Sequence, residues 1–300
     1  MAAAASGCTV RLFAPTENRI YFVSTPRARV TDASSKRGRQ CYGCNMNRWL
    51  LVILLSCSAL GCKSGSPSST QPDARPDAGG ITAVLEEVGE HGLVFYDVSG
   101  PEALVLCFHG SGGSAEGWTT GDKHSMLLEL RAIGYSFVCP TSQDQERAQW
   151  SSVNTKSNPD VNNIDSLLET LGVDTSRALF LLGHSNGGGF TSRFALLSER
   201  TTEVSAIQLS NAAGIAAAMA RDEYRFPTMF AYAICDHVVS SVDVLANRDL
   251  LISKQPSVDV LDHPLDEVYE NGDYEHCHKF VDTSAATADF FSAAAERAGR

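Results

Sequence analysis

Residues 179–197 contain the pattern that most restricts how this chain can fold, because an apolar run passes into a helical segment through a very short turn. The large apolar residues 179–182 predict a buried strand, and the spacing of residues 190–197 predicts a helix. Between them lies Gly183-His184-Ser185-Asn186-Gly187, whose glycines let two backbones approach closely. A Gly-x-Ser-x-Gly turn between a strand and a helix is typical of a nucleophile elbow. We therefore predict that the Ser185 hydroxyl projects from the carboxyl edge of a sheet, with the positive end of a helix behind it.

Short apolar runs alternate with amphipathic segments from residue 93 onward. Such alternation predicts βαβ units, and therefore an α/β fold with a mostly parallel central sheet flanked by helices. The continuous apolar character of the runs suits strands that are covered on both faces. The expected strands are residues 93–98, 104–108, 135–139, 179–182, 204–209, 229–234 and 258–261, and the expected helices are 126–133, 161–171, 190–197, 242–252 and 283–297.

A second strand-to-turn element lies upstream, where the apolar run 104–108 leads into His109-Gly110-Ser111-Gly112-Gly113. In the α/β-hydrolase fold this loop supplies one backbone N–H of the oxyanion hole, and the residue after the nucleophile supplies the other. The predicted oxyanion donors are thus the N–H groups of Ser111 and Asn186. His109 is expected to be a structural loop residue, because the base of this fold follows the serine and the acid along the chain.

The acid and the base should follow the serine in that order. Asp236 comes just beyond the apolar run 229–234, where a carboxylate can orient an imidazole, and Asp243 is the alternative acid. The base belongs before the last helix, where both His276 and His278 qualify. The sequence slightly favours His278, because an aromatic residue follows it two positions later.

A secretory signal is predicted at residues 46–62. Its apolar stretch, residues 49–60, is too short to cross a bilayer core of roughly 30 Å. The sequence Ala59-Leu60-Gly61-Cys62 then resembles a bacterial lipobox, in which the cysteine is lipidated after cleavage, and Cys57 ends a competing site. We expect lipidation at Cys62 and export to the periplasm or the cell surface, with membrane contact only through the lipid anchor.

Shifts in composition divide the chain into three parts. Residues 1–62 are expected to be an N-terminal extension plus the lipoprotein-type signal, and Met46 is a candidate for the true start. Residues 63–80 are rich in Ser, Pro, Asp and Gly and predict a flexible linker. The catalytic domain is expected over residues 81–300. The net charge of −11 argues against a nucleic-acid partner, because phosphate binding needs clustered Lys and Arg.

The segment from Asp160-Val161 through Val173-Asp174 to Gly-His-Ser-Asn-Gly-Gly is similar to the exported polyhydroxybutyrate depolymerase and feruloyl esterase-like branch of the α/β-hydrolases. The His-Gly loop at 109–110 and the turn Asp236-His237-Val238-Val239 share this resemblance. It implies a serine esterase that acts on polymeric or small-molecule esters without a metal or an organic cofactor. The chain departs from the branch around the base, where Glu-His-Cys-His-Lys-Phe replaces the usual Gly-Gly-His-x-Trp.

Two alternative functions and one covalent link follow from the same residues. A serine triad suits any acyl transfer, so a peptidase or amidase is one alternative, and a non-catalytic surface lipoprotein on a hydrolase scaffold is another. Cys235 precedes the acid and Cys277 lies between the two possible bases, so we predict that these cysteines form a disulfide in the exported protein. The pocket walls are expected to come from loops such as 114–124, 140–159 and 212–227.

Overall fold

The computed structural model describes residues 83–174, 176–265, 277–278 and 283–299. The predicted signal, the lipidation site Cys62 and the linker 63–80 lie outside these ranges, as does the alternative base His276. No helix within the described ranges is both long enough and apolar enough to span a membrane. The division of the chain into three parts stays a prediction.

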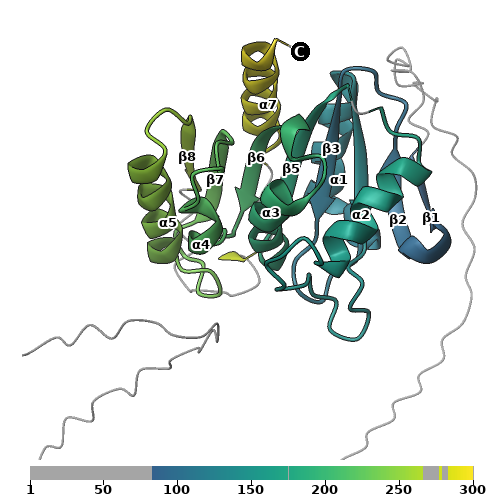
Figure 1. The fold of residues 1–300 in the computed structure, drawn as a ribbon, viewed down its shortest axis with the longest axis horizontal. Coiled ribbons are helices and arrows are strands. Elements are labelled where there is room, and N and C mark those ends of the chain that lie inside the picture. Colours follow the sequence, from purple (N-terminus) through teal and green to yellow (C-terminus); the bar gives the residue numbers. More distant parts are fainter. Residues whose placement is uncertain (1–82, 175, 266–276, 279–282, 300) are drawn as a thin grey trace, which may run out of the picture. The chain divides into compact units, whose positions relative to one another are not determined.

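The described strands form one sheet in the order β1-β2-β4-β3-β5-β6-β7-β8 (Figure 1). β2 pairs antiparallel with both β1 and β4, and every other neighbouring pair is parallel. This mostly parallel sheet confirms the predicted fold class. The strands are β1 (Val84–Glu87), β2 (Leu93–Asp97), β3 (Ala103–Phe108), β4 (Tyr135–Pro140), β5 (Ala178–His184), β6 (Val204–Ser210), β7 (Thr228–Ala233) and β8 (Val260–Leu265).

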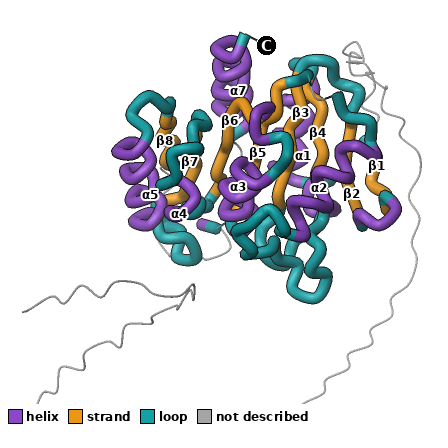
Figure 2. Tube along the Cα trace, in the orientation of Figure 1, coloured by secondary structure: helices purple, strands orange, loops and turns teal. Residues whose placement is uncertain are grey.

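Helices cover both faces of the sheet (Figure 2). Apolar side chains of α2, α3, α4 and α5 pack into the core on one face, and those of α1 and α7 pack into the core on the other. The α-helices are α1 (Gly121–Ala132), α2 (Pro159–Thr170), α3 (Asn186–Leu197), α4 (Ala216–Met219), α5 (Ser241–Lys254) and α7 (Ser284–Ala298), and short 3-10 turns lie at η1 (Gly89–His91), η2 (Ala115–Trp118) and η3 (Thr201–Glu203).

The central strand β3 shows why the apolar runs of the sequence are continuous. Successive side chains of a strand point to opposite faces of the sheet. Leu104, Leu106 and Phe108 join the core beneath α2 and α3, whereas Val105 and Cys107 join the core beneath α1 and α7. All five side chains are buried, so a strand in the middle of this sheet has no solvent face on which a polar residue would be tolerated.

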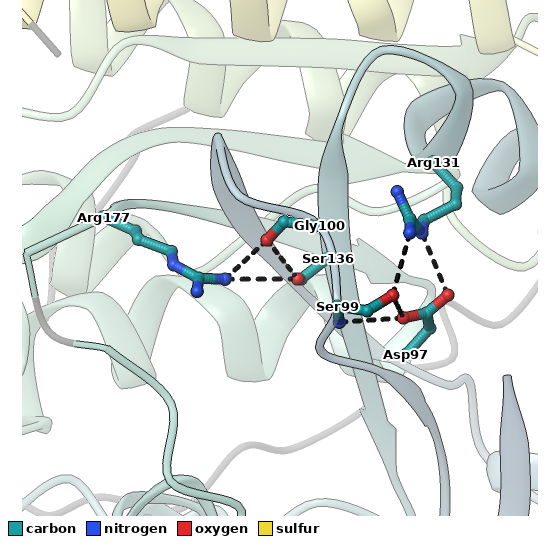
Figure 3. Close-up of polar contacts among 6 residues, drawn as sticks. All are labelled: Asp97, Ser99, Gly100, Arg131, Ser136 and Arg177. Carbon is teal, nitrogen blue, oxygen red and sulfur yellow. Dashed lines mark hydrogen bonds and ion pairs between the residues drawn. The ribbon is translucent and has the colours of Figure 1, made fainter. Parts of the chain in front are cut away.

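Polar contacts fasten the β2–β3 connection at the amino ends of the parallel strands (Figure 3). The Arg131 guanidinium of α1 donates to the buried Asp97 carboxylate over 2.9 Å, and the same carboxylate accepts the Ser99 N–H over 2.9 Å. Arg177, just before β5, donates to the Gly100 carbonyl oxygen. This network lies at the amino edge of the parallel strands, whereas β5 ends at the opposite, carboxyl edge. The network therefore stabilises the scaffold, and the carboxyl edge is formed by other residues.

The sequence missed β1 and placed the start of α1 too late. All four residues of Val84–Glu87 are exposed, and β1 pairs only with β2, so the strand carries no buried apolar pattern to detect. Helix α1 begins at Gly121 rather than at 126, because its first turns expose polar residues and only its later part, from Met126 onward, enters the core. The other predicted strands and helices agree with the structure to within a few residues, apart from the start of α3.

Candidate active site

Ser185 occupies the sharp turn between β5 and α3. Its backbone has φ 52° and ψ −119°, a region that residues other than glycine rarely adopt and that costs about 1–3 kcal/mol. The conformation is held because the Ser185 N–H donates to the Ser210 carbonyl oxygen over 3.0 Å, and the Ser185 carbonyl oxygen accepts the Gly188 N–H over 3.0 Å. The predicted turn therefore forms, with Ser185 immediately before the first residue of a helix.

Glycines around this turn allow the close packing that the sequence predicted. A Cβ atom on Gly183 would lie 2.6 Å from the Gly187 carbonyl oxygen and would also collide with the Thr191 hydroxyl. A Cβ atom on Gly187 would lie 2.5 Å from the His109 carbonyl oxygen. Since real Cβ atoms do not approach other heavy atoms so closely, β5, α3 and the loop after β3 can meet only if both positions are glycine.

A series of two hydrogen bonds joins Asp236, His278 and Ser185. His278 Nδ1 lies 2.7 Å from Asp236 Oδ2, and His278 Nε2 lies 3.0 Å from Ser185 Oγ. The buried carboxylate is itself fixed, because Asp236 Oδ1 accepts the N–H groups of Val238 and Val239 over 2.7 and 3.1 Å. An ionised carboxylate accepts the proton on Nδ1, which leaves the lone pair of Nε2 directed at the serine hydroxyl.

The disulfide predicted between Cys235 and Cys277 is present, with a Cα–Cα distance of 5.4 Å. Each half-cystine is the chain neighbour of one residue in the hydrogen-bonded series, Asp236 or His278. The bridge thus links the turn after β7 covalently to the segment that carries the imidazole. Cys107 and Cys139, the other cysteines in the described ranges, are free thiols buried in the core.

Two backbone segments approach Ser185, the loop after β3 and the first turn of α3. A Cβ atom on Gly110 would be only 3.2 Å from the Ser185 Cβ atom, so the loop after β3 passes close to the serine. Ser111 follows in that loop and lines the same cavity as Ser185. Asn186 is the first residue of α3, and an N–H in that position has no acceptor within its own helix. The structure therefore places Ser111 and Asn186, the residues predicted to carry the oxyanion donors, near the serine.

His109 stabilises the loop after β3 and does not take part in the hydrogen-bonded series of Asp236, His278 and Ser185. Its Nδ1 lies 2.7 Å from the Gly110 carbonyl oxygen, and its Nε2 accepts the Ser142 N–H over 3.1 Å. Burial lowers the pKa of His109 to about 4, so the ring is neutral at pH 7. Trp150 completes the support, since its indole N–H donates to the His109 carbonyl oxygen and its backbone N–H donates to the Asn186 side chain.

The serine and the imidazole open into a cavity of about 290 Å³. Of the wall loops predicted at 114–124, 140–159 and 212–227, only Lys123 contributes a lining residue among those that the structure describes. Two larger hollows are lined by α7 together with the start of β8 or the segment just before it, and Ser185 lines neither of them. Trp118 and Trp150 are fully or almost fully buried, and neither lines this cavity.

Two lining residues, His184 and Lys123, were not recognised in the sequence. His184 Nε2 lies 3.2 Å from the His278 carbonyl oxygen and so contacts the backbone of the imidazole-bearing residue. Burial, together with the nearby Lys123 ammonium, lowers the pKa of His184 to about 3. Lys123 could not be found from local pattern, because it lies in the polar first turn of α1, where a solvated lysine would look the same.

The alternative prediction, that Asp243 is the acid, is wrong. Asp243 lies exposed in the first turn of α5, whereas Asp236 contacts the imidazole of His278. His237 is exposed on the surface, and His263 is a partly buried residue of β8. Within the described part of the chain, no three or more His, Cys, Asp or Glu side chains are grouped as metal ligands.

Comparisons with solved structures place this arrangement among known folds. TT1662 from Thermus thermophilus superposes with a TM-score of 0.52 at 16% identity, over 71% of this chain and 98% of its own. ATU1826 from Agrobacterium tumefaciens, a protein of unknown function described as a candidate α/β-hydrolase, superposes with a TM-score of 0.52 at 12% identity, over 70% of this chain and 94% of its own. The chain has the α/β-hydrolase fold. No protein-family model matches the sequence, and no curated protein sequence matches it.

Within this α/β-hydrolase fold, the serine, the acid and the histidine occur in the order that the fold uses, after β5, after β7 and before the last helix. At such low sequence identity the structural likeness establishes the fold alone. The chemistry of the chain therefore has to be argued from the site itself.

Proposed function

We propose that this chain is an exported serine hydrolase that cleaves carboxylic esters, with Ser185, His278 and Asp236 as its catalytic triad. The hydrogen-bonded series from Asp236 through His278 to Ser185 carries the proposal, because it gives the hydroxyl a base and gives the base a fixed orientation. The resemblance of residues 160–190 to the polyhydroxybutyrate depolymerase and feruloyl esterase-like branch favours esters over amides.

In the acylation half of the reaction, Ser185 Oγ attacks the ester carbonyl carbon while His278 Nε2 takes the hydroxyl proton. The carbon–oxygen bond to the alcohol then breaks, and His278 returns the proton to the leaving alkoxide. Asp236 stabilises the imidazolium that forms between these steps, without itself accepting the proton. The products of this half are a free alcohol and an acyl group bound to Ser185.

Deacylation repeats the same steps with water as the nucleophile. His278 Nε2 takes a proton from water as the hydroxide oxygen attacks the acyl carbon, and the proton then passes to Ser185 Oγ as the acyl–enzyme bond breaks. A carboxylic acid leaves and the free serine is restored. Neither half requires a metal or an organic cofactor.

The N–H groups of Ser111 and Asn186 bind the negative oxygen that develops in both halves. The helix dipole of α3 favours the same charge, because Asn186 is the first residue of that helix. Removal of one such donor costs about 2.7–4 kcal/mol of transition-state stabilisation. Since every residue except proline carries a backbone N–H, the rigidity of the loop after β3 matters more here than the identity of its side chains.

We also propose that the enzyme is a lipoprotein attached through Cys62. The apolar run and the Ala59-Leu60-Gly61-Cys62 sequence support this, and the polar linker gives the domain distance from the membrane. Metabolic labelling with a fatty-acid analogue should mark the wild-type protein and not Cys62→Ser. Label that persists in Cys62→Ser and disappears in Cys57→Ser would move the attachment to Cys57.

An ester panel from acetyl through feruloyl to hydroxybutyrate oligomers tests the main proposal. Ser185→Ala should lose about 10⁴-fold or more in kcat and all labelling by a fluorophosphonate. Ser253→Ala, an exposed serine of α5, is the matched control and should resemble the wild type. Wild-type protein that is folded but unreactive toward both the panel and the probe would favour a non-catalytic lipoprotein. Faster cleavage of an anilide than of the p-nitrophenyl ester of the same acid would favour an amidase.

A further inference from the structure

His184 connects the nucleophile turn to the segment that carries the base. It is the last residue of β5 and the chain neighbour of Ser185. Its Nε2 lies 3.2 Å from the His278 carbonyl oxygen, and the two imidazole rings pack with their centroids 5.4 Å apart. Both histidines line the cavity that contains Ser185. The proton transfers proposed above use only one of these two rings, that of His278.

The strand sets the direction of the His184 side chain. Successive residues of a strand point to opposite faces of the sheet, so His184 lies on the same face as Phe180 and Leu182. Those two side chains belong to the core beneath α1 and α7. A Cβ atom on Gly110 would lie 3.1 Å from His184 Nδ1, so the glycine makes room for the ring. The ring therefore lies close to both the loop after β3 and the backbone of His278.

The His184 ring is neutral and carries its hydrogen on Nε2. Burial is the main cause that lowers the pKa of His184 to about 3, so at pH 7 the ring has a single N–H. A carbonyl oxygen only accepts hydrogen bonds, so the nitrogen beside the His278 carbonyl oxygen is the one that donates. A neutral donor also suits this place electrostatically. During the proposed reaction the His278 ring becomes a cation, and a second cationic ring 5.4 Å away would oppose that change.

The backbone at His278 is thus restrained from the sides of both its partners. On the side of the acid, a disulfide bonds the preceding residue, Cys277, to the turn after β7. On the side of the nucleophile, His184 donates to the His278 carbonyl oxygen. The imidazole reaches Asp236 over 2.7 Å and Ser185 over 3.0 Å, and both distances depend on where this backbone lies. A misplacement of about 1 Å in such an arrangement can cost about 100-fold in rate.

We propose that His184 is a positioning residue, which fixes the backbone of His278 relative to Ser185 and so keeps the imidazole within reach of the serine hydroxyl. It acts through the base rather than on the substrate. The inference rests on the proposed ester hydrolysis and goes beyond it by giving a function to the residue before the nucleophile. Loss of the His184 donor should lower kcat and leave KM nearly unchanged, because the imidazole is needed for proton transfer and not for substrate binding.

Two substitutions that differ in the donor test the proposal. His184→Gln keeps an N–H group at the end of its side chain, whereas His184→Met has a side chain of the same length without a donor. The measured quantities are kcat and KM for p-nitrophenyl acetate, with folding checked by circular dichroism. We expect kcat to fall about tenfold or more in His184→Met, which corresponds to about 1.4 kcal/mol. In His184→Gln, kcat should stay within about threefold of the wild type, because the hydrogen bond to His278 can still form.

Two further variants make the result specific to the contact with the base. His91→Met is the matched control, because the His91 ring makes hydrogen bonds with Asn163 and Thr170 over 2.8 and 3.2 Å and does not line the cavity. Its kcat should equal that of the wild type. His184→Met is also made in a His278→Ala background, where the residual kcat should not fall further, because residues that act as a unit are not additive.

The wild-type protein provides a measurement that needs no variant. The ring ¹⁵N chemical shifts of His184 show which nitrogen carries the hydrogen. We expect the hydrogen on Nε2 at pH 7, since only that tautomer donates to the His278 carbonyl oxygen. This measurement still decides the proposal if His184→Met fails to fold.

The outcomes separate this inference from the proposed function. An unchanged kcat in His184→Met, an equal loss in His184→Gln, or the same loss in the His278→Ala background would overturn the role of His184 and leave ester hydrolysis standing. A ring hydrogen on Nδ1 would do the same. Folded wild-type protein that cleaves no ester and resists the fluorophosphonate would overturn both proposals. A loss of kcat that appears in His184→Met, recovers in His184→Gln and vanishes without His278 would establish the positioning role.

Discussion

Removal of the Cys235–Cys277 disulfide should weaken both the stability and the activity of the domain. The bridge closes a loop with a sequence separation of 42 residues, for which the loss of chain entropy in the unfolded state amounts to about 4 kcal/mol. Replacement of both cysteines by alanine should therefore lower the free energy of unfolding by about 4 kcal/mol. Because small domains are stable by only about 5–15 kcal/mol, a loss of this size should be plain in urea unfolding followed by circular dichroism.

The effect on activity follows from where the two sulfurs are attached. Asp236 and His278 approach within 2.7 Å of each other, and each is the chain neighbour of one bridged cysteine. Without the bridge, the imidazole has to keep its position through non-covalent contacts, and a misplacement of about 1 Å can cost about 100-fold in rate. We expect kcat to fall at least tenfold in Cys235→Ala/Cys277→Ala, with a smaller change in KM, under conditions where the variant is folded.

Reduction of the wild-type protein provides an independent route to the same state. Wild-type protein treated with dithiothreitol should show the activity and the urea midpoint of the double variant. The same treatment should leave the double variant unchanged, which controls for effects on the buried thiols Cys107 and Cys139. An untreated double variant that keeps wild-type kcat and loses less than about 1 kcal/mol of unfolding free energy would refute the argument that the bridge holds the acid and the base together.

Further predictions concern stability. Gly183→Ala should lower the free energy of unfolding by about 3 kcal/mol or more, or prevent folding. Gly189→Ala should be neutral or stabilising, because the nearest heavy atom to its Cβ would be 3.8 Å away. Equal urea midpoints for the two variants would contradict the packing argument. The pKa of His109 is about 4 in the folded state and 6.5 in the unfolded state. Between these two pH values the unfolded state binds more protons than the folded state. The free energy of unfolding should therefore decrease by about 3 kcal/mol as the pH falls from 6.5 to 4. Urea unfolding of His109→Gln at several pH values should show a shallower decrease, and an unchanged slope would disprove this origin. Asp160→Asn should lower the free energy of unfolding by about 1–3 kcal/mol, because the buried carboxylate accepts the N–H groups of Gln143 and Ser151; an unchanged urea midpoint would contradict this.

Local sequence determined the parts of the site that are built by a single turn of backbone. The bend at Ser185 needs small residues where the strand and the helix approach each other. The sequence has glycine at both of these positions, Gly183 and Gly187, so the bend could be predicted. The same is true of the loop around Ser111, which follows a fully apolar strand. Asp236 was predictable for a related reason, since a carboxylate just beyond a late strand reaches the same carboxyl edge as the serine. The alternation of apolar runs was likewise enough to predict a mostly parallel sheet.

Tertiary structure alone decided which groups from separate elements meet. Two histidines two positions apart in the sequence were nearly equivalent as bases, and only the fold shows that His278 reaches both Ser185 and Asp236. Nothing in the first turn of α1 distinguishes Lys123 from an ordinary surface lysine. Its place in the cavity depends on how α1 packs against the sheet and on the contact of its ammonium with the Trp118 ring. Local sequence specifies backbone geometry over a few residues, whereas the distance between side chains of different elements depends on the packing of the whole core.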